Sequence, residues 1–421
     1  MTLKKLSGLL LACLFVAWVP ALAQEKLLIP HIDKLQYDPA MTLSEAIEAA
    51  TVNFPRSHLA DAFREQARAW DRRSGGILAG PVMFGVSYAG DQVGDDTGQW
   101  GIDTDLTFML WKWGQKNAAH EMADESALYA RKFQDAMKLQ VAGLVREALW
   151  DMALKRADNE TARRVLEVSE RLTEAVRKRV DAGDLPRTDL LLAETDLLKR
   201  RAQALSAEAE WMHARRRYLN LTRLERAPQK FKETLQPANA ISPTHPLIAA
   251  ATARIQQMKA LVRWSRFESD TGNQQVYFSV GSRHQHGERG GPTTHGIAAN
   301  LTIPFGGGRY QAPNVAEKSV ALAEAEAERG DLKRRLERDL HEAEHKLEVD
   351  QVQLEAARVR HELARQNLSL ARQAFDAGEM NLIDLLRLQV MAQEAVREHR
   401  RWQLRVDMDI ARYNQAVGVL P

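Results

Sequence analysis

Residues 181–191 read DAGDLPRTDLL and residues 376–386 read DAGEMNLIDLL, so one pattern occurs twice in the chain. Each stretch carries a glycine where one long helical pattern stops and the next begins, which predicts a tight turn between two helices. The same offset of 195 residues brings Leu106-Thr107 onto Leu301-Thr302 and Tyr218 onto Tyr413. Because one offset relates points that lie far apart in the chain, the sequence indicates an internal duplication.

The stretches that lead into these turns predict two very long helices. Residues 117–182 and 314–377 contain no proline and one glycine each, and the strong helix formers Ala, Leu, Glu and Arg dominate both. Their apolar residues recur at spacings of three and four in a narrow stripe, which is typical of a coiled-coil seam. The stripes comprise Met122, Ser126, Tyr129, Phe133 and Ala136, then Val165, Val168, Leu172 and Ala175, and later Val352, Ala356, Val359 and Leu363. Helices on the order of 100 Å long predict a helical tube or rod.

Each half also contains two segments in which apolar and polar residues alternate, the pattern of half-buried strands. They are residues 82–88 and 102–110 in the first half, and 276–280 and 297–305 in the second. Polar, glycine-rich stretches join the members of each pair, at 90–98 and 283–294. Segments of about ten residues suffice for a tilted strand to cross a bilayer. Two hairpins packed on a soluble core are the alternative, which Asp103 and Asp105 disfavour because their positions suit a wet lumen.

Four strands cannot close a barrel alone, and lipid does not tolerate an open sheet edge. Three chains would supply twelve strands, enough for a closed transmembrane barrel with a lumen. Trp111 and Trp113 end the second strand, where an aromatic girdle would lie. A packing cluster is the other interpretation of this pair, and their position relative to the strand favours the girdle.

Composition excludes several classes of protein. The 421 residues include 27% charged side chains, too many for a polytopic helical membrane protein. The 58 Lys and Arg balance 56 Asp and Glu, so the basic surplus of a nucleic-acid-binding protein is absent.

The first residues predict a secretory signal peptide. Lys4 and Lys5 precede an apolar run, and the small-residue motif Ala21-Leu22-Ala23 predicts cleavage after Ala23. Cys13 is the only cysteine and lies within the signal, so the mature chain has no disulfide and no thiol ligand. Lipidation of Cys13 is an alternative that the apolar residues after it disfavour.

Four passages carry a resemblance to the TolC family of outer-membrane efflux proteins. Thr42-Leu-Ser-Glu-Ala-Ile-Glu-Ala-Ala50, followed by Asn53-Phe-Pro55, is similar to the family's opening helix. Residues 106–114, which end in Lys-Trp-Gly, resemble its passage from strand to helix, and Asn300-Leu-Thr-Ile-Pro-Phe305 is the counterpart in the second half. Residues 182–193 and 377–386 resemble its two periplasmic turns. The resemblance covers essentially the whole mature chain.

This resemblance implies a mainly α fold with a small β part and an internal duplication. Three chains would build a long-helix α-barrel in the periplasm and a 12-stranded transmembrane β-barrel in the outer membrane of a Gram-negative bacterium. We expect a signal peptide at 1–23, a first structural repeat at 24–224 with its strand pair at about 81–111, a linker at 225–243, and a second repeat at 244–421 with its strand pair at about 275–305.

The implied function is a passive exit duct. Its partners would be two further copies of the chain, a periplasmic adaptor (membrane fusion) protein, an inner-membrane transporter of the RND type, and outer-membrane lipid. No nucleic acid and no cofactor are expected. The cargo stays open between heavy-metal cations, as in the CusC and CzcC groups, and drugs or secreted proteins.

The resemblance also assigns site residues. The adaptor would meet the two turns, at Gly183 and Leu185 and at Gly378 and Met380. The glycines have a capping role, whereas Leu185 and Met380 are expected to be exposed apolar contacts.

The periplasmic gate would lie at Asp384, which three-fold symmetry would place in a ring of three carboxylates. Arg387 lies one turn away and can pair with Asp384. Asp189, the repeat partner of Asp384, would tie neighbouring helices together away from the axis. An ordinary charge at a helix N-terminus is the alternative interpretation of Asp384.

An enzyme and a soluble periplasmic coiled-coil scaffold are the remaining alternatives. His120-Glu121 begins like H-E-x-x-H, but residue 124 is Asp, so no zinc motif follows. No catalytic, cofactor-binding or metal-ligating residues are assigned, and His341 and His345 are interpreted as part of a solvated helix face. His284, His286 and His295 are expected around one polar surface loop. The repeated strand pairs argue against the scaffold.

Overall fold

The computed structural model describes residues 34–268 and 275–421, and every helix and strand lies in one unit, Leu35–Pro421. The predicted signal peptide and Cys13 lie outside the described residues. The first half comprises β1 (Gln36–Asp38), α1 (Leu43–Val52), α2 (Ser57–Ser74), β2 (Met83–Gly90), β3 (Trp100–Leu110), α3 (Gln115–Asp181) and α4 (Arg187–Thr222). The second half comprises β4 (Arg226–Pro228), α5 (Pro246–Ser265), β5 (Val276–His286), β6 (Thr293–Thr302), α6 (Gly308–Asp376) and α7 (Leu382–Ala416).

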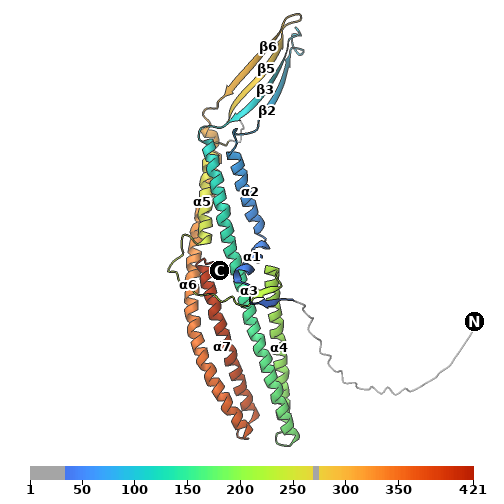
Figure 1. Ribbon diagram of the computed structural model, residues 1–421, viewed down its shortest axis with the longest axis vertical. Helices are drawn as coiled ribbons and strands as arrows, with labels where there is room; N and C mark the ends of the chain where they lie inside the picture. Colours follow the sequence, from blue (N-terminus) through green and yellow to red (C-terminus); the bar gives the residue numbers. More distant parts are fainter. Residues whose placement is uncertain (1–33, 269–274) are drawn as a thin grey trace, which may run out of the picture. The chain divides into compact units, whose positions relative to one another are not determined.

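The predicted long helices are confirmed. Helix α3 has 67 residues and α6 has 69, so each is on the order of 100 Å long. Helix α3 packs against α2, α4, α5 and α7, whereas α6 packs against α5 and α7 (Figure 1). In the half that holds the two turns, the helices therefore follow the order α4, α3, α7, α6. Helices α4 and α6 form the two edges of this layer.

The two turns have the same backbone conformation. Gly183 has φ +84° and Gly378 has φ +79°, a left-handed conformation that glycine adopts without a steric penalty. The N–H of Asp184 donates to the carbonyl of Arg179, and the N–H of Glu379 donates to the carbonyl of Ala374, both at 2.8 Å. These bonds span five residues, as in a Schellman motif. Both long helices therefore end in the same way, as the repeated motif predicts.

The strands form one antiparallel sheet in the order β2-β3-β5-β6. Leu106 lies opposite Phe84 on β2 and opposite Val280 on β5, which fixes the register of the three strands. Strands β2 and β6 are the edges. The four predicted strands are confirmed, but their bounds differ: β5 continues to His286, and β6 begins at Thr293 and ends at Thr302, before the predicted Phe305. The connecting loop is consequently shorter than the sequence predicts.

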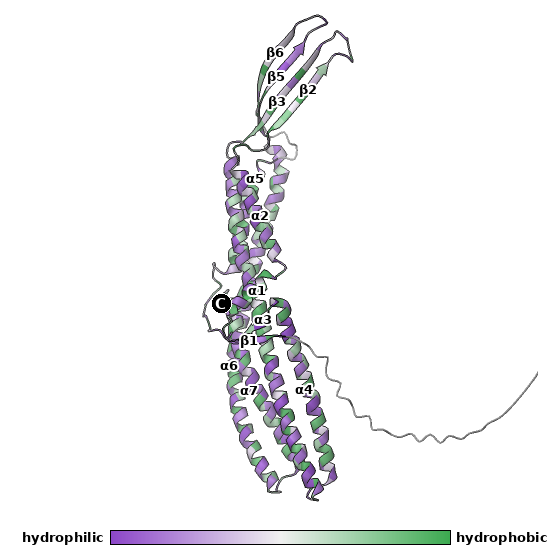
Figure 2. Cartoon of the chain, turned by 45° about the vertical axis from the view of Figure 1, so that its right-hand side comes forward, coloured by the Kyte–Doolittle hydropathy of each residue, from purple (hydrophilic) through white to green (hydrophobic). Residues whose placement is uncertain are grey.

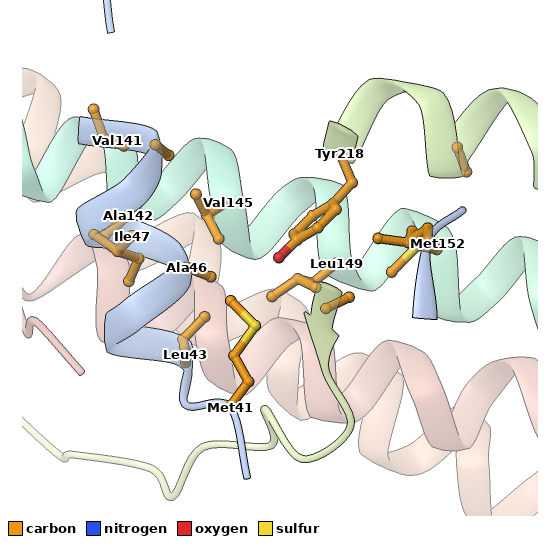
Figure 3. Close-up of a cluster of buried hydrophobic side chains, with 14 residues drawn as sticks. Met41, Leu43, Ala46, Ile47, Val141, Ala142, Val145, Leu149, Met152 and Tyr218 are labelled. Carbon is orange, nitrogen blue, oxygen red and sulfur yellow. The ribbon is translucent and has the colours of Figure 1, made fainter. Parts of the chain in front are cut away.

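The main core lies midway along α3, where α1 and the end of α4 meet the linker between the two halves. Helix α1 begins with a capping box, in which Thr42 and Glu45 bond each other reciprocally. In the core, Ile47 of α1 packs against α3, and Tyr218 of α4 packs over Leu149 (Figure 3). Strand β1 pairs in parallel with β4 and holds the linker beside this core. Arg146 of α3 is buried next to it and binds Glu233 of the linker through two bonds of 2.8 and 2.7 Å.

Candidate functional site

The sheet has one apolar and one polar face, because successive residues of a strand point to opposite sides. The pairing register places on one face Phe84, Val86, Tyr88, Ile102, Leu106, Phe108, Phe278, Val280, Ile297 and Leu301. Most of these side chains are exposed in the single chain. Three open features therefore coincide: one uncovered apolar face and two unpaired strand edges.

The opposite face is polar and carries a charged pair. Arg283 of β5 donates to both carboxylate oxygens of Asp103 on β3, at 3.0 Å each. Asp105 accepts a bond of 2.8 Å from the hydroxyl of Thr107 on the same strand. Charges and hydroxyls on this face, opposite the apolar one, are the arrangement expected of a wet lumen.

The two tryptophans after β3 differ in their surroundings. The Trp111 indole N–H donates to the carbonyl of Gly76 at 3.1 Å, and its ring packs in a cluster with Trp70 and Trp264. Trp113 is fully exposed in the single chain. Trp111 therefore has the packing role that the sequence left as an alternative, whereas the girdle role of Trp113 remains a prediction.

At the turn end of the helices, an apolar cluster ties the two halves together. It buries Val176, Ala193, Ala371, Phe375, Leu382 and Leu385, and the turn residues Leu185 and Met380 pack against it. Leu185 and Met380 are half-buried and not exposed as expected, and their contact with an adaptor remains a prediction. The chain bends back at each glycine, and this reversal directs the following apolar side chain inward.

A groove between α4 and α7 presents other apolar side chains at this end. It is lined by Leu192, Thr195, Asp196, Lys199, Ile383, Leu386, Arg387 and Val390. Ile383 is 56% exposed. Sequence reasoning overlooked it because its neighbours Leu382 and Leu385 are buried and only the tertiary structure separates the two sets.

Asp384 lies in the first turn of α7 and is tied to the residue that caps this helix. Its carboxylate accepts a bond of 2.8 Å from the amide of Asn381, and its backbone N–H donates to the Asn381 oxygen at 2.8 Å. Arg387 lies 4.0 Å from Asp384, an exposed pair one turn apart. Asp189 occupies the matching first turn of α4. One carboxylate oxygen of Asp384 therefore contacts the N-cap residue Asn381, and the other lies 4.0 Å from Arg387.

The structure contains an acidic pair that the sequence did not single out. Asp409 of α7 and Asp350 of α6 are both buried between their helices. Lys346 lies 3.0 Å from Asp350 and 3.9 Å from Asp409, and Arg412 lies 3.3 Å from Asp409. Burial, together with the neighbouring Asp350 carboxyl, raises the pKa of Asp409 to about 6, against the opposing charges of Lys346 and Arg412.

This raised pKa predicts a pH-dependent stability. The folded chain binds a proton at Asp409 more tightly than the unfolded chain, whose carboxyl titrates near 3.8. The contribution to stability is therefore largest at low pH and is lost as pH rises through about 6. We expect Asp409→Asn to raise Tm at pH 7.5 by about 2–4 °C and to change it little at pH 4.5. Thermal unfolding followed by circular dichroism at both pH values tests this, and an equal shift at both would contradict it.

The described residues contain neither a metal-binding cluster nor a membrane-spanning helix. No group of three or more His, Cys, Asp or Glu within 34–268 and 275–421 is placed to hold a metal ion. In the same part of the chain, no helix has both the length and the apolar character that crossing a membrane requires. Glu121, next to His120, pairs with Arg263 of α5. His345 lies beside Glu348 on the exposed surface of α6.

Comparison with known families then identifies the relatives of this fold. The model of the outer membrane efflux protein family matches residues 80–222, which run from β2 to the end of α4. Over these residues the chain is similar to outer membrane efflux proteins. No curated protein sequence matches the chain significantly.

Solved structures extend the likeness to both halves of the chain. The CmeC outer membrane channel of Campylobacter jejuni has a TM-score of 0.68 and 17% identity, over 89% of this chain and 85% of that one. CusC has a TM-score of 0.71 and 14% identity, over 90% and 92%. The outer membrane protein VceC of Vibrio cholerae has a TM-score of 0.69 and 17% identity, over 89% and 96%. At these identities, the likeness establishes the fold.

Proposed function

We propose that the chain is one third of a homotrimeric outer-membrane duct, through which an efflux system passes its cargo out of the cell. The observation that carries this proposal is the four-stranded sheet, with its uncovered apolar face and two open edges. Lipid would cover the apolar face, and β2 of one copy would pair with β6 of the next. The Asp103–Arg283 face would line the lumen.

The helices support the same assembly through two unpartnered seams. On α6, apolar residues recur at a heptad spacing and are exposed in the single chain: Val349, Val352, Val359, Leu363 and Leu370. On α4, Leu191, Leu198 and Leu205 recur every seven residues and are also exposed. Helices α4 and α6 are the two edges of the helical layer, so the seam of one copy would pack on that of another. Figure 2 shows hydrophobic residues interspersed with hydrophilic ones along these helices.

The partners belong to the same proposal. A periplasmic adaptor would dock at the turn end of the helices, and an inner-membrane transporter of the RND type would supply the energy. Heavy-metal cations, drugs and secreted proteins remain candidate cargoes. Likeness at 14–17% identity establishes the fold alone, so it favours none of these cargoes.

Fractionation and a deletion strain test the proposal. We expect detergent to release the protein from outer membranes and salt to leave it there. Release by salt alone would contradict the membrane role. The deletion strain, challenged with copper, zinc, cobalt, drugs and dyes, should lose tolerance to at least one class. Lost drug tolerance with unchanged metal tolerance would remove the metal alternative.

The gate role of Asp384 predicts a change in conductance. Three carboxylates at a constriction attract cations, so Asp384→Ala should reduce cation selectivity and block by trivalent cations in planar bilayers. Asp189→Ala is the matched control, because this aspartate occupies the same position in the other repeat. We expect it to leave both properties unchanged. Unchanged selectivity in Asp384→Ala would place the constriction elsewhere.

A further inference from the structure

Two histidines face each other directly across the pair of strands β5 and β6. His284 pairs with His295 in the register, and their Nδ1 atoms lie 2.6 Å apart. The ring centroids are 4.8 Å apart, and the ring planes are inclined at 70°. The expected polar loop is therefore corrected, since both residues belong to strands. The nearby His286 also belongs to β5, but its Nδ1 bonds the hydroxyl of Thr293 at 3.1 Å.

The position of this pair is unusual for its face of the sheet. His284 lies in the same cross-strand row as Ile102, and His295 precedes Ile297 on the same side of β6. The next residue of this face on β5, Ser282, lies 3.3 Å from the Nε2 of His284. The two imidazoles and this hydroxyl are thus grouped at one end of the apolar face.

The short distance between the two Nδ1 atoms indicates that the rings share a bound proton or ion, because rings that only pack against each other do not bring nitrogen atoms this close. Nitrogen atoms at 2.6 Å require a proton between them, so one ring donates and the other accepts. A divalent transition metal binds imidazole nitrogen at about 2.0–2.1 Å, which separates two ligands by roughly 2.9–3.4 Å for angles between 90° and 109°. A small side-chain rotation opens the pair to that range. His295 is exposed and lies on edge strand β6 of the single chain.

We propose that His284 and His295 form a binding site for one divalent transition-metal cation per chain, of the class that imidazole prefers: Zn²⁺, Ni²⁺ or Cu²⁺. The metal takes the place of the shared proton between the two Nδ1 atoms, and that proton moves to the Nε2 of its own ring. Water from the loop end of the sheet, two residues away on each strand, completes the coordination. Two protein ligands leave the site open, so it binds metal reversibly. The site does not depend on the cargo of the duct, because it lies on the face opposite the Asp103–Arg283 pair.

Titration of the purified full chain in detergent with ZnCl₂ tests the site. We expect one Zn²⁺ per chain in isothermal titration calorimetry. His284→Ala and His295→Ala should each weaken binding by at least about tenfold, because each removes half of the protein ligands. The matched control is His286→Ala, which removes an imidazole two residues away that bonds Thr293 instead. It should change the affinity by less than about threefold.

Copper adds a readout of ligand number. With one equivalent of CuSO₄, the EPR spectrum of the wild type should show coupling to two nitrogens, and that of either alanine variant to fewer. The double variant His284→Ala/His295→Ala keeps His341 and His345 on α6, and it keeps the stacked rings of His361 on α6 and His399 on α7, whose centroids lie 5.2 Å apart. Unchanged zinc affinity or an unchanged two-nitrogen spectrum in this variant would place the ion at one of those helical pairs and overturn the proposal. Absence of saturable zinc binding in the wild type would overturn it as well.

Discussion

Arg146→Ala is expected to destabilise the folded chain by about 3–5 kcal/mol, the cost of leaving the partner of a buried ion pair uncompensated. Arg146 is 4% exposed and Glu233 is 10% exposed, measured on their side chains. The guanidinium holds both oxygens of Glu233 and also donates to the carbonyl of Val419 at 3.0 Å. Its loss therefore releases the linker and the C-terminal segment from α3 together.

Thermal unfolding checks this expectation. We expect Tm to fall by more than about 5 °C in Arg146→Ala. Arg163→Ala is the control, because Arg163 makes a single bond to Glu208 at the surface, and such pairs contribute about 0–1 kcal/mol. The double variant Arg146→Ala/Glu233→Gln should recover part of the loss, since it removes the unpaired charge. Equal Tm values for Arg146→Ala and Arg163→Ala would show that the buried pair has no special role.

Leu185→Asp combined with Met380→Asp is expected to reduce efflux to the level of the deletion strain while the trimer still forms. Two physical effects are expected to cause this loss of efflux. The new carboxylates lie against Phe375 and the rest of the apolar cluster, where burial disfavours a charge. They also change the surface that the proposed adaptor would meet. The trimer persists because the seams on α4 and α6 are untouched.

Two further variants separate these effects. Leu185→Ala removes packing and adds no charge, so it should lower the stability of the turns and retain most efflux. Ile383→Asp adds a charge at an exposed position in the groove between α4 and α7, so it should impair efflux without a change in Tm. The assay measures drug or metal tolerance together with the amount of trimer in outer membranes. Full efflux in Leu185→Asp/Met380→Asp would refute the proposed role of the turns.

In the candidate sites, the local sequence pattern predicts backbone conformation but does not predict which side chains are buried or paired. The sequence placed Gly183 and Gly378 at helix ends, because a glycine after a long helical pattern reports its own backbone conformation. It misjudged Leu185 and Met380, because their burial depends on how two helical hairpins converge. The Arg146–Glu233 pair joins residues 87 positions apart, and no local signal marks such a pair. The acidic pair of Asp350 and Asp409 could not be predicted for the same reason, because its members lie on different helices.

Helix periodicity, turn glycines, strand alternation and the offset of 195 residues were readable in the sequence, since each depends on neighbours within a few residues or on direct repetition. The tertiary structure decided which apolar seams are used within the chain and which stay open on α4 and α6. It also decided that His284 meets His295, because that contact depends on the β5–β6 register and on a loop shorter than the pattern predicted. Contacts of this kind are set by the packing of distant segments, which local periodicity does not encode.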